Sequence, residues 1–379
     1  MMRFFDAHCD TVGPLLESAA DFLVEPADRA AAAARGAFVP HITLPALKAG
    51  GIGAQVFASW VWGSKYKGIE FETGMAKVQA VRKLCADFPD DLFLASTGAD
   101  LAAPFGAPTD CVITGGVAGG SAPGAASRIA VLPSLEGSDS LAGDIDNLFA
   151  FYEAGVRLLT LAWDDTPFCG SAYGGGSGLT KKGVDLVAAC ESLGVMVDVS
   201  HLSDQGFADL CQVAEVPFVA SHSNCRALCP SPRNLSDEMI RILGKRGGVM
   251  GITLAPGFLS ADYFEEERAG TGEALESIRS GEMTYEQVQE QEVAAMANVA
   301  LPPLRVVVDH VKRAIDKGGE DCVGLGGDLD GVDYLPAGFQ GAEDYPHIEE
   351  LLRAGGLTAS QVDKVCHGNM LRVFQEILG

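Results

Sequence analysis

The chain has 379 residues, of which 47% are hydrophobic, and this is enough apolar material for a large buried core. Lysine and arginine total 27 and aspartate and glutamate total 51, so the formal net charge is −24. Such acidity argues against nucleic-acid backbones and anionic membrane surfaces as partners. No apolar run approaches the roughly 20 residues of a membrane-spanning helix, and we expect no cleavable signal ahead of His8. With ten scattered cysteines and no C-x-x-C spacing, we expect a cytoplasmic protein with reduced thiols.

Eight short apolar runs predict the strands of a parallel sheet. They are residues 4–7, 52–58, 129–132, 156–161, 195–199, 217–220, 249–254 and 322–325. Eight is the number that closes a parallel barrel, so we predict an α/β fold, a (β/α)8 TIM-like barrel of the metal-dependent hydrolase type. A ninth run, 91–95, is expected outside the barrel or at its edge. A doubly wound open sheet is the alternative architecture.

Helical patterns separate these runs. Thr180 is a plausible N-cap, apolar residues follow at helical spacing, and Gly194 ends that helix. Ser203 and Ser236 are expected to cap the next two helices. A further helix is expected to run up to Gly318. We predict that residues 360–378 form one closing helix.

We expect residues 1–379 to form a single catalytic barrel domain with two unusual segments. Residues 104–128 are rich in Gly, Pro, Ala and Ser, which predicts a flexible surface loop. Residues 261–303 carry ten acids and two arginines with helical character. They form either a helical insertion over the site or a solvated helix pair, and charge runs are more often solvated.

Polar residues follow five of the predicted strands at their carboxyl ends. They are His8 and Asp10, Glu136, His201, His222 and Asp328. An H-x-D pair on a strand places both side chains on one face, whereas Cys9 between them is expected to point to the other face. Parallel barrels build active sites from such strand ends. A lone histidine after a strand is more often structural, but the joint placement of these residues favours one site.

Two histidines, one H-x-D pair and one glutamate are more ligands than the four of a structural zinc. They suit two cations about 3.5–4 Å apart, with Glu136 as the bridging carboxylate. Imidazole with carboxylate suits Zn²⁺ best, with Mn²⁺, Co²⁺ or Fe²⁺ as alternatives. Asp328, in a Gly-rich turn with Asp330, is positioned to move a proton, although a plain turn is the alternative. Arg233 is a candidate clamp for a substrate carboxylate, unless it is only a surface ion pair.

At these residues the chain resembles the renal dipeptidase family, also called the membrane dipeptidases or M19 metallopeptidases. The matching motifs are residues 6–10 (DAHCD), 133–137 (PSLEG), 198–203 (DVSHLS), 220–224 (ASHSN), 233–235 (RNL), 326–331 (GGDLDG) and 368–374 (GNMLRVF). The order and spacing of these motifs fit almost end to end.

The resemblance implies a distorted barrel with two Zn²⁺ ions per chain. It implies His8 and Asp10 on one zinc, His201 and His222 on the other, and Glu136 bridging both. The resemblance also implies that Asp328 is the proton-handling catalytic acid near the substrate amine and that Arg233 binds the substrate carboxylate. The family cleaves dipeptides, tolerates a D-residue at the C-terminal side and often forms homodimers.

Two positions depart from the animal members of this family. Trp163, a candidate substrate-binding residue, stands where they carry a histidine that stabilises the tetrahedral intermediate, and a tryptophan here resembles the bacterial branch. Leu254 stands where they often have a substrate-binding tyrosine. Both changes alter the pocket that the substrate enters.

These patterns suggest three functions. The first is a zinc dipeptidase in which a hydroxide bridging two zinc ions attacks the peptide carbonyl. The second keeps both metals but cleaves another small amide or a cyclic amide, as Trp163 and Leu254 suggest. The third is a catalytically silent barrel that binds a metal or a peptide, and the completeness of the predicted site argues against it.

Overall fold

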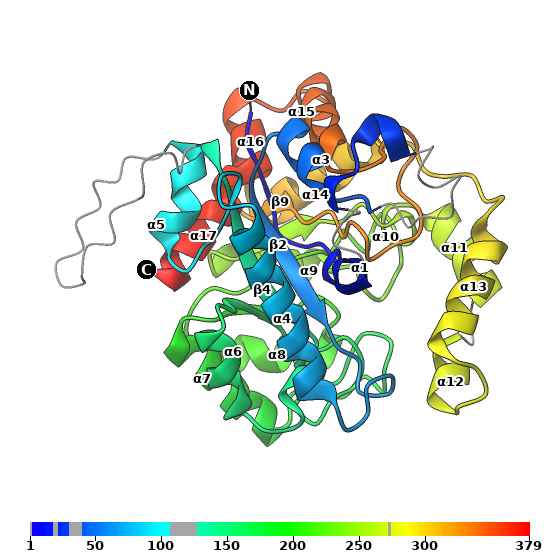
Figure 1. Cartoon of the computed structure of the whole chain (residues 1–379). Helices are drawn as coiled ribbons and strands as arrows, with labels where there is room; N and C mark the ends of the chain where they lie inside the picture. Colours follow the sequence, from blue (N-terminus) through cyan, green and yellow to red (C-terminus); the bar gives the residue numbers. More distant parts are fainter. Residues whose placement is uncertain (1, 18–21, 30–39, 107–126, 272–273) are drawn as a thin grey trace.

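We describe the protein from a computed structural model that covers residues 2–17, 22–29, 40–106, 127–271 and 274–379 (Figure 1). The predicted Gly-rich loop lies mostly outside the described residues, because these omit residues 107–126. Among the described residues, no helix combines the length and the apolar character that crossing a membrane requires.

Eight parallel strands close into a barrel, as the sequence predicts. The strands of the sheet are β1 (Phe4–Asp6), β2 (Ile52–Trp60), β3 (Leu92–Leu94), β4 (Ile129–Glu136), β5 (Leu158–Thr160), β6 (Met196–Asp198), β7 (Val219–Ala220), β8 (Val249–Ile252) and β9 (Val323–Leu325). The order around the ring is β2-β1-β9-β8-β7-β6-β5-β4, and pairing of β2 with β4 closes it. This closure excludes the open doubly wound sheet.

The ninth strand, β3, lies at the edge of the barrel. The first half of β4 pairs with β3, from Ile129 to Val131, and the second half pairs with β5, from Ser134 to Glu136. Strand β3 therefore extends the sheet beside the first half of β4 without joining the ring. This is the position expected for the run at residues 91–95.

Side-chain alternation along the strands separates two hydrophobic cores. Phe4 belongs to the core between the barrel and its helices, whereas Phe5 belongs to the core inside the barrel. The inner core also contains Phe374 of the last helix, whose ring lies 5.2 Å from that of Phe5. The last helix therefore packs against the apolar interior of the barrel, and the polar strand ends are left to the opposite mouth.

Helices surround the barrel. They are α1 (Val12–Glu17), α3 (Leu44–Ala49), α4 (Glu70–Asp87), α5 (Gly98–Ala102), α6 (Asn147–Glu153), α7 (Lys181–Leu193), α8 (Asp204–Val213), α9 (Asp237–Lys245), α10 (Pro256–Leu259), α11 (Ala261–Thr271), α12 (Ala274–Arg279), α13 (Tyr285–Met296), α14 (Val306–Gly318), α15 (Tyr345–Ala354), α16 (Ala359–Asp363) and α17 (Asn369–Leu378). Thr180, Ser203 and Ser236 cap α7, α8 and α9 as predicted, each accepting a backbone N–H.

One predicted helix is not continuous. The sequence predicts a single helix over residues 360–378, but α16 and α17 are joined by a π-helical turn, Lys364–Gly368. Such a turn inserts a residue into the helical ladder and rotates the helical residues beyond it. The rotation falls just before α17, whose residues Met370 and Phe374 pack into the barrel.

The acidic segment forms three helices, α11, α12 and α13, which Figure 1 draws in yellow at one edge of the molecule. Val288 and Met296 of α13 are buried, so this helix has one packed side. Arg279 at the end of α12 forms an ion pair with Asp164 in the loop after β5. The segment therefore contacts the barrel near the carboxyl ends of its strands.

Candidate metal centre

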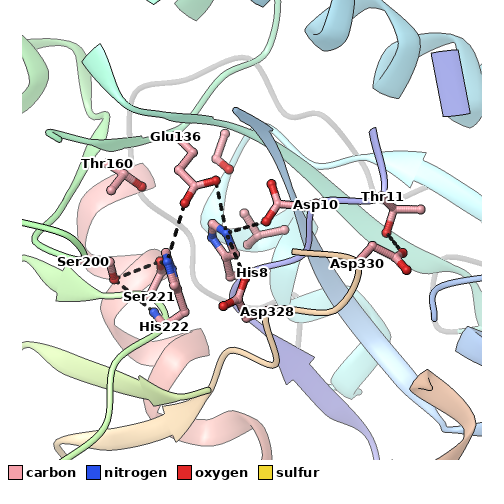
Figure 2. A network of polar contacts seen from close by, with 12 residues as sticks. His8, Asp10, Thr11, Glu136, Thr160, Ser200, Ser221, His222, Asp328 and Asp330 are labelled. Carbon is pink, nitrogen blue, oxygen red and sulfur yellow. Dashed lines mark hydrogen bonds and ion pairs between the residues drawn. The ribbon is translucent and has the colours of Figure 1, made fainter. Parts of the chain in front are cut away.

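The carboxyl ends of the barrel strands bring the six predicted strand-end residues together. Figure 2 shows five of them, and the sixth, His201, lies 3.0 Å from Glu136. Glu136 is the last residue of β4, and His8 and His222 follow β1 and β7. Ligand atoms of these three residues lie within 4.8 Å of one another. The rings of His8 and His222 stack with centroids 3.7 Å apart.

The two carboxylate oxygens of Glu136 face different histidines. Its Oε2 lies 3.6 Å from Nε2 of His8, while its Oε1 lies 3.0 Å from Nε2 of His201 and 3.6 Å from Nε2 of His222. A carboxylate in this position can contribute one oxygen to each of two cations.

Asp10 and Asp328 approach His8 from its other side. Asp10 Oδ2 lies 3.4 Å and Asp328 Oδ1 lies 4.0 Å from Nε2 of His8. Both ring nitrogens of His8 are buried and have no hydrogen-bond partner in the described part of the chain. A buried imidazole that is surrounded by carboxylates but not hydrogen-bonded fits a divalent cation, and imidazole with carboxylate is a donor set that suits zinc.

A hydrogen-bond chain fixes the orientation of His222. Ser221 Oγ donates to Asp198 Oδ2 over 2.6 Å, and the same hydroxyl lies 2.8 Å from Nδ1 of His222. Because the hydroxyl has one proton and gives it to the carboxylate, it must accept from Nδ1–H of His222. The Nε2 atom then carries a lone pair and faces Glu136, which is the tautomer that a metal ligand needs.

Asp198 is the hub of this chain. Its carboxylate also accepts the backbone N–H groups of Ser200 and Ser221 and the hydroxyl of Thr160, which lies 2.6 Å away. Asp198 is completely buried. It belongs to the motif that contains His201. Neither its residue type nor its position in the sequence predicts that it supports His222.

His201 and Asp328 have left-handed backbone conformations, with φ of 66° and 61°. Residues other than glycine seldom adopt this region, and it costs about 1–3 kcal/mol where it occurs. The backbone N–H of Asp328 donates to the carbonyl oxygen of His8 over 3.1 Å, so the loops after β1 and β9 are held together. The turn thus does more than reverse the chain, because it fixes Asp328 beside His8.

The protonation of the centre is set by burial and mutual charge. Burial disfavours the charged form of His8, but the carboxylates of Glu136 and Asp10 outweigh it and raise the pKa of His8 well above its ordinary value. Burial, together with neighbouring positive charge, lowers the pKa of His201 and His222 well below the ordinary value. Burial also raises the pKa of Glu136 and Asp328. Positive charge in the centre would therefore favour the ionised form of both carboxylates.

Arg233 is buried rather than exposed, which excludes a surface ion pair. It is 3% exposed, and its Nη2 donates to the carbonyl oxygen of His222 over 3.2 Å. Its Nε and Nη1 atoms have no hydrogen-bond partner within the described ranges. Two unpartnered donors on a buried guanidinium beside the centre suit a carboxylate ligand.

Trp163 and Leu254 differ in their access to the centre. The ring of Trp163 lies 6.0 Å from that of His201 and is partly exposed. Leu254 is 1% exposed within the outer core. Of the two departures, only Trp163 is placed to touch a substrate.

Three other residues of types that can bind metals have structural environments. His310 accepts from the backbone N–H of Cys225 and lies 3.0 Å from the carbonyl oxygen of Leu259. Cys9 is buried in the outer core. Asp330 accepts from Thr11 and from the backbone of residues 41 and 42, so it holds loops rather than facing the centre.

Comparison with known proteins gives the same family as the motifs. The family model for membrane dipeptidases (peptidase family M19) matches residues 121–378. An uncharacterized protein in the pqqA 5′ region of Klebsiella pneumoniae is 32% identical over 257 residues, which cover 66% of this chain and 82% of that protein. Mouse dipeptidase 3 is 26% identical over 343 residues, 88% of this chain, and this chain spans only 57% of the mouse protein.

Solved structures share the fold across the whole chain. A metallo peptidase from Rhodobacter sphaeroides, liganded with a phosphinate mimic of the dipeptide L-Ala-D-Ala, superposes with a TM-score of 0.73 at 24% identity and 99% coverage of both chains. The probable dipeptidase PvdM from Pseudomonas aeruginosa gives 0.75 at 19% identity, with 89% of each chain covered. Since the family model spans more than half of the sequence, the chain belongs to the membrane dipeptidase family, peptidase family M19.

Proposed function

We propose that the chain is a zinc dipeptidase that holds two cations and cleaves dipeptides, including those with a C-terminal D-residue. Membership of the M19 family supports a metallo-dipeptidase. The observation that carries the two-metal proposal is the division of the Glu136 oxygens between His8 on one side and His201 with His222 on the other. The Rhodobacter structure with a mimic of L-Ala-D-Ala supports the inclusion of D-residues.

In this proposal His8 and Asp10 hold one cation, His201 and His222 hold the other, and Glu136 contacts both. Two cations at this position supply an activated water at neutral pH and polarise the scissile carbonyl. Asp328 stands at the edge of the centre, where a carboxylate can accept a proton and pass it to the leaving amine.

Arg233 fixes the direction of the substrate. The edge formed by its Nη1 and Nη2 groups can receive the C-terminal carboxylate of a dipeptide, because Nη1 has no hydrogen-bond partner among the described residues. Anchoring that carboxylate beside His222 brings the peptide bond over the centre. Trp163 then borders the bound substrate near His201.

Hydrolysis of a dipeptide library tests the activity directly. The purified protein, supplied with zinc, is assayed on L-Xaa-L-Xaa and L-Xaa-D-Xaa dipeptides while metal content is measured by elemental analysis. We expect turnover and two zinc ions per chain. Absence of hydrolysis for every dipeptide would overturn the substrate assignment, and a content of one or zero would overturn the two-metal site.

Glu136→Gln separates an enzyme from a silent barrel. It keeps the shape of the side chain but removes its charge, so turnover is lost while the circular dichroism spectrum is unchanged. Glu153→Gln, at an exposed position on α6, is the matched control and keeps full activity. A wild-type protein that binds zinc without any turnover would support the silent barrel instead.

A second function, hydrolysis of another small or cyclic amide, is favoured by Trp163 beside His201. Such a substrate has no terminal carboxylate for Arg233 to bind. Arg233→Ala would then leave the activity on the true substrate intact, whereas a dipeptidase would lose most of its kcat/KM. Arg241→Ala, on the partly exposed side of α9, controls for loss of a charge.

A further inference from the structure

All three tryptophans of the chain lie on one side of the candidate metal centre. The rings of Trp60 and Trp62 lie 5.1 and 5.2 Å from that of Trp163. Tyr285 of α13 completes the group, 5.4 Å from Trp60 and 6.4 Å from Trp62. We call Trp60, Trp62, Trp163 and Tyr285 the aromatic wall.

The aromatic wall borders the metal centre. Trp60, the last residue of β2, pairs with Glu136, the last residue of β4. Trp163 lies 6.0 Å from the ring of His201. Burial and the charge of nearby Asp10 raise the pKa of Tyr285. Trp60, Trp163 and Tyr285 are only partly buried, so part of each side chain is open to solvent.

Polar contacts fasten the acidic segment to this wall. Asp164 accepts from Nε1 of Trp62 over 2.9 Å and pairs with Arg279 at the end of α12. Nζ of Lys65 lies 3.9 Å from the ring centroid of Tyr285 and 3.1 Å from Glu286. Helices α12 and α13 are thereby held against the loops after β2 and β5.

The order of strands sets the β2 part of the wall, Trp60 and Trp62, opposite the proposed carboxylate clamp. Counting round the ring in either direction, four steps separate β2 from β7. Trp60 and Trp62 stand at the end of β2, whereas Arg233 lies in the connection between β7 and α9. A dipeptide whose carboxylate binds Arg233 therefore extends across the centre and directs its amino-terminal residue toward the wall.

Positive charge lies behind the rings. Lys77 of α4 is 6% exposed, and its Nζ donates to the carbonyl oxygen of Trp60 over 2.6 Å, 5.4 Å from the ring of the same residue. Together with Lys65 it places two ammonium groups against the wall. These two ammonium groups already make cation–π contacts with the rings, so a third cation would gain little there, whereas an uncharged ring would gain apolar contact and edge-to-face packing.

We propose that the aromatic wall is a specificity subsite for the amino-terminal side chain of the substrate, selecting aromatic and large apolar residues and rejecting lysine and arginine. This subsite rests on the proposed dipeptidase function. It gives the segment 261–303 a part in substrate choice, through Tyr285 and the Asp164–Arg279 ion pair.

The first test compares Phe-Ala, Gly-Ala and Lys-Ala, with Ala in whichever configuration is hydrolysed. We expect kcat/KM for Phe-Ala to exceed the other two by about 10–100-fold, the gain typical of burying one large apolar side chain. Tyr285→Ala should reduce this preference by about 5-fold or more, chiefly through KM, and Tyr285→Phe should retain it. Equal rates on all three substrates would overturn the subsite.

The ion pair provides a second comparison within the same segment. Arg279→Ala removes the contact with Asp164 and should lower the preference for Phe-Ala, whereas Arg268→Ala, at an exposed position of α11, should not. Equal effects of the two substitutions, or a uniform loss on all substrates, would show that the segment supports the fold without selecting the side chain.

Binding tests the subsite independently of turnover. Because every tryptophan lies in the wall, selectively excited tryptophan fluorescence reports on the wall. The zinc-loaded Asp328→Asn variant, which should not turn over, is titrated with Phe-Ala and Gly-Ala. A larger spectral shift and tighter binding with Phe-Ala are expected. If no dipeptide is hydrolysed by the wild type, the proposed function fails, and this titration still decides whether the wall binds an aromatic side chain.

Discussion

At the scale of single residues, the centre depends on groups that never touch a metal. Ser221 and Asp198 select the tautomer of His222 and hold its ring toward Glu136. Partners of this kind commonly change metal affinity by about 10–100-fold when removed. The geometry of the centre therefore depends on residues that contact the candidate metal ligands without being ligands themselves.

Ser221→Ala tests the hydrogen-bond support of His222. It leaves Nδ1 of His222 without its acceptor, so we expect about 10–100-fold weaker zinc binding in a competition with a chromophoric chelator. Ser223→Ala is the matched control, since its buried hydroxyl has no partner within the described residues. Equal zinc affinities for the two variants would contradict the role of Ser221.

Asp139 gives a prediction on pH and stability. Burial raises its pKa to about 7, and its Oδ2 has no hydrogen-bond partner within the described chain. Between its ordinary pKa near 3.8 and about 7, the unfolded chain releases a proton that the folded chain keeps, so stability falls as pH rises and the penalty is complete above pH 7.

Asp139→Asn removes that penalty. We expect it to raise the free energy of unfolding by about 1–2 kcal/mol at pH 8 and by much less at pH 4, measured by urea unfolding against wild type at each pH. Asp90→Asn, at an exposed position, should show no such difference. A gain that is independent of pH would contradict the assignment to Asp139.

The residues that meet at the candidate centre were predictable because each is a chemically distinctive side chain directly after an apolar run. His8, Glu136 and His222 show this pattern. The supporting roles of Ser221 and Asp198 were not predictable, because serine and aspartate occur in many structural roles and only their contacts show that they orient His222. The aromatic wall joins residues more than 200 positions apart, such as Trp60 and Tyr285, and nothing local in the sequence connects them.

At the scale of elements, cap and breaker residues located the helices better than apolar spacing did. Helix α7 begins after Thr180 and ends before Gly194 as predicted, and Gly194 has a φ of 71°. The π-helical turn at Lys364–Gly368 was missed because the same spacing of apolar residues fits either a continuous or an interrupted helix. Its cause lies in the packing of α17 into the barrel, which local sequence does not express.

Thr180→Ala tests the cap of α7. The hydroxyl accepts from the backbone N–H of Gly183 and donates to the carbonyl oxygen of Pro167, so its loss should cost about 1–2 kcal/mol of unfolding free energy. Thr180→Ser keeps both bonds and should cost much less. A melting temperature unchanged by Thr180→Ala would contradict this account.

At the scale of the whole molecule, the concentration of acid around His8 predicts that a bound cation stabilises the fold. Asp10, Glu136 and Asp328 surround His8, and burial raises the pKa of Glu136 and Asp328. Cations that bind only the folded chain stabilise it by mass action. The barrel closure was predictable from eight runs, and the strands follow one another around the ring in their order along the chain once β3 is left out.

Metal removal should therefore affect stability as well as activity. Treatment with a strong chelator is expected to abolish hydrolysis and lower the melting temperature by several degrees, the shift that a loss of a few kcal/mol produces in a chain of this size. Adding zinc should restore both. A chelated protein with unchanged melting temperature would contradict the stabilising role of the cations.

The contact between the loops after β1 and β9 also orders events during synthesis. Thr11 and Asp330 are hydrogen-bonded across 319 positions, next to the bond between Asp328 and His8. At roughly 5–20 residues per second, His8 leaves the ribosome about a quarter of a minute to a minute before Asp328 is added. A nascent chain thus carries a bare imidazole through most of translation, and the centre can be assembled only after ribosomal elongation has passed β9.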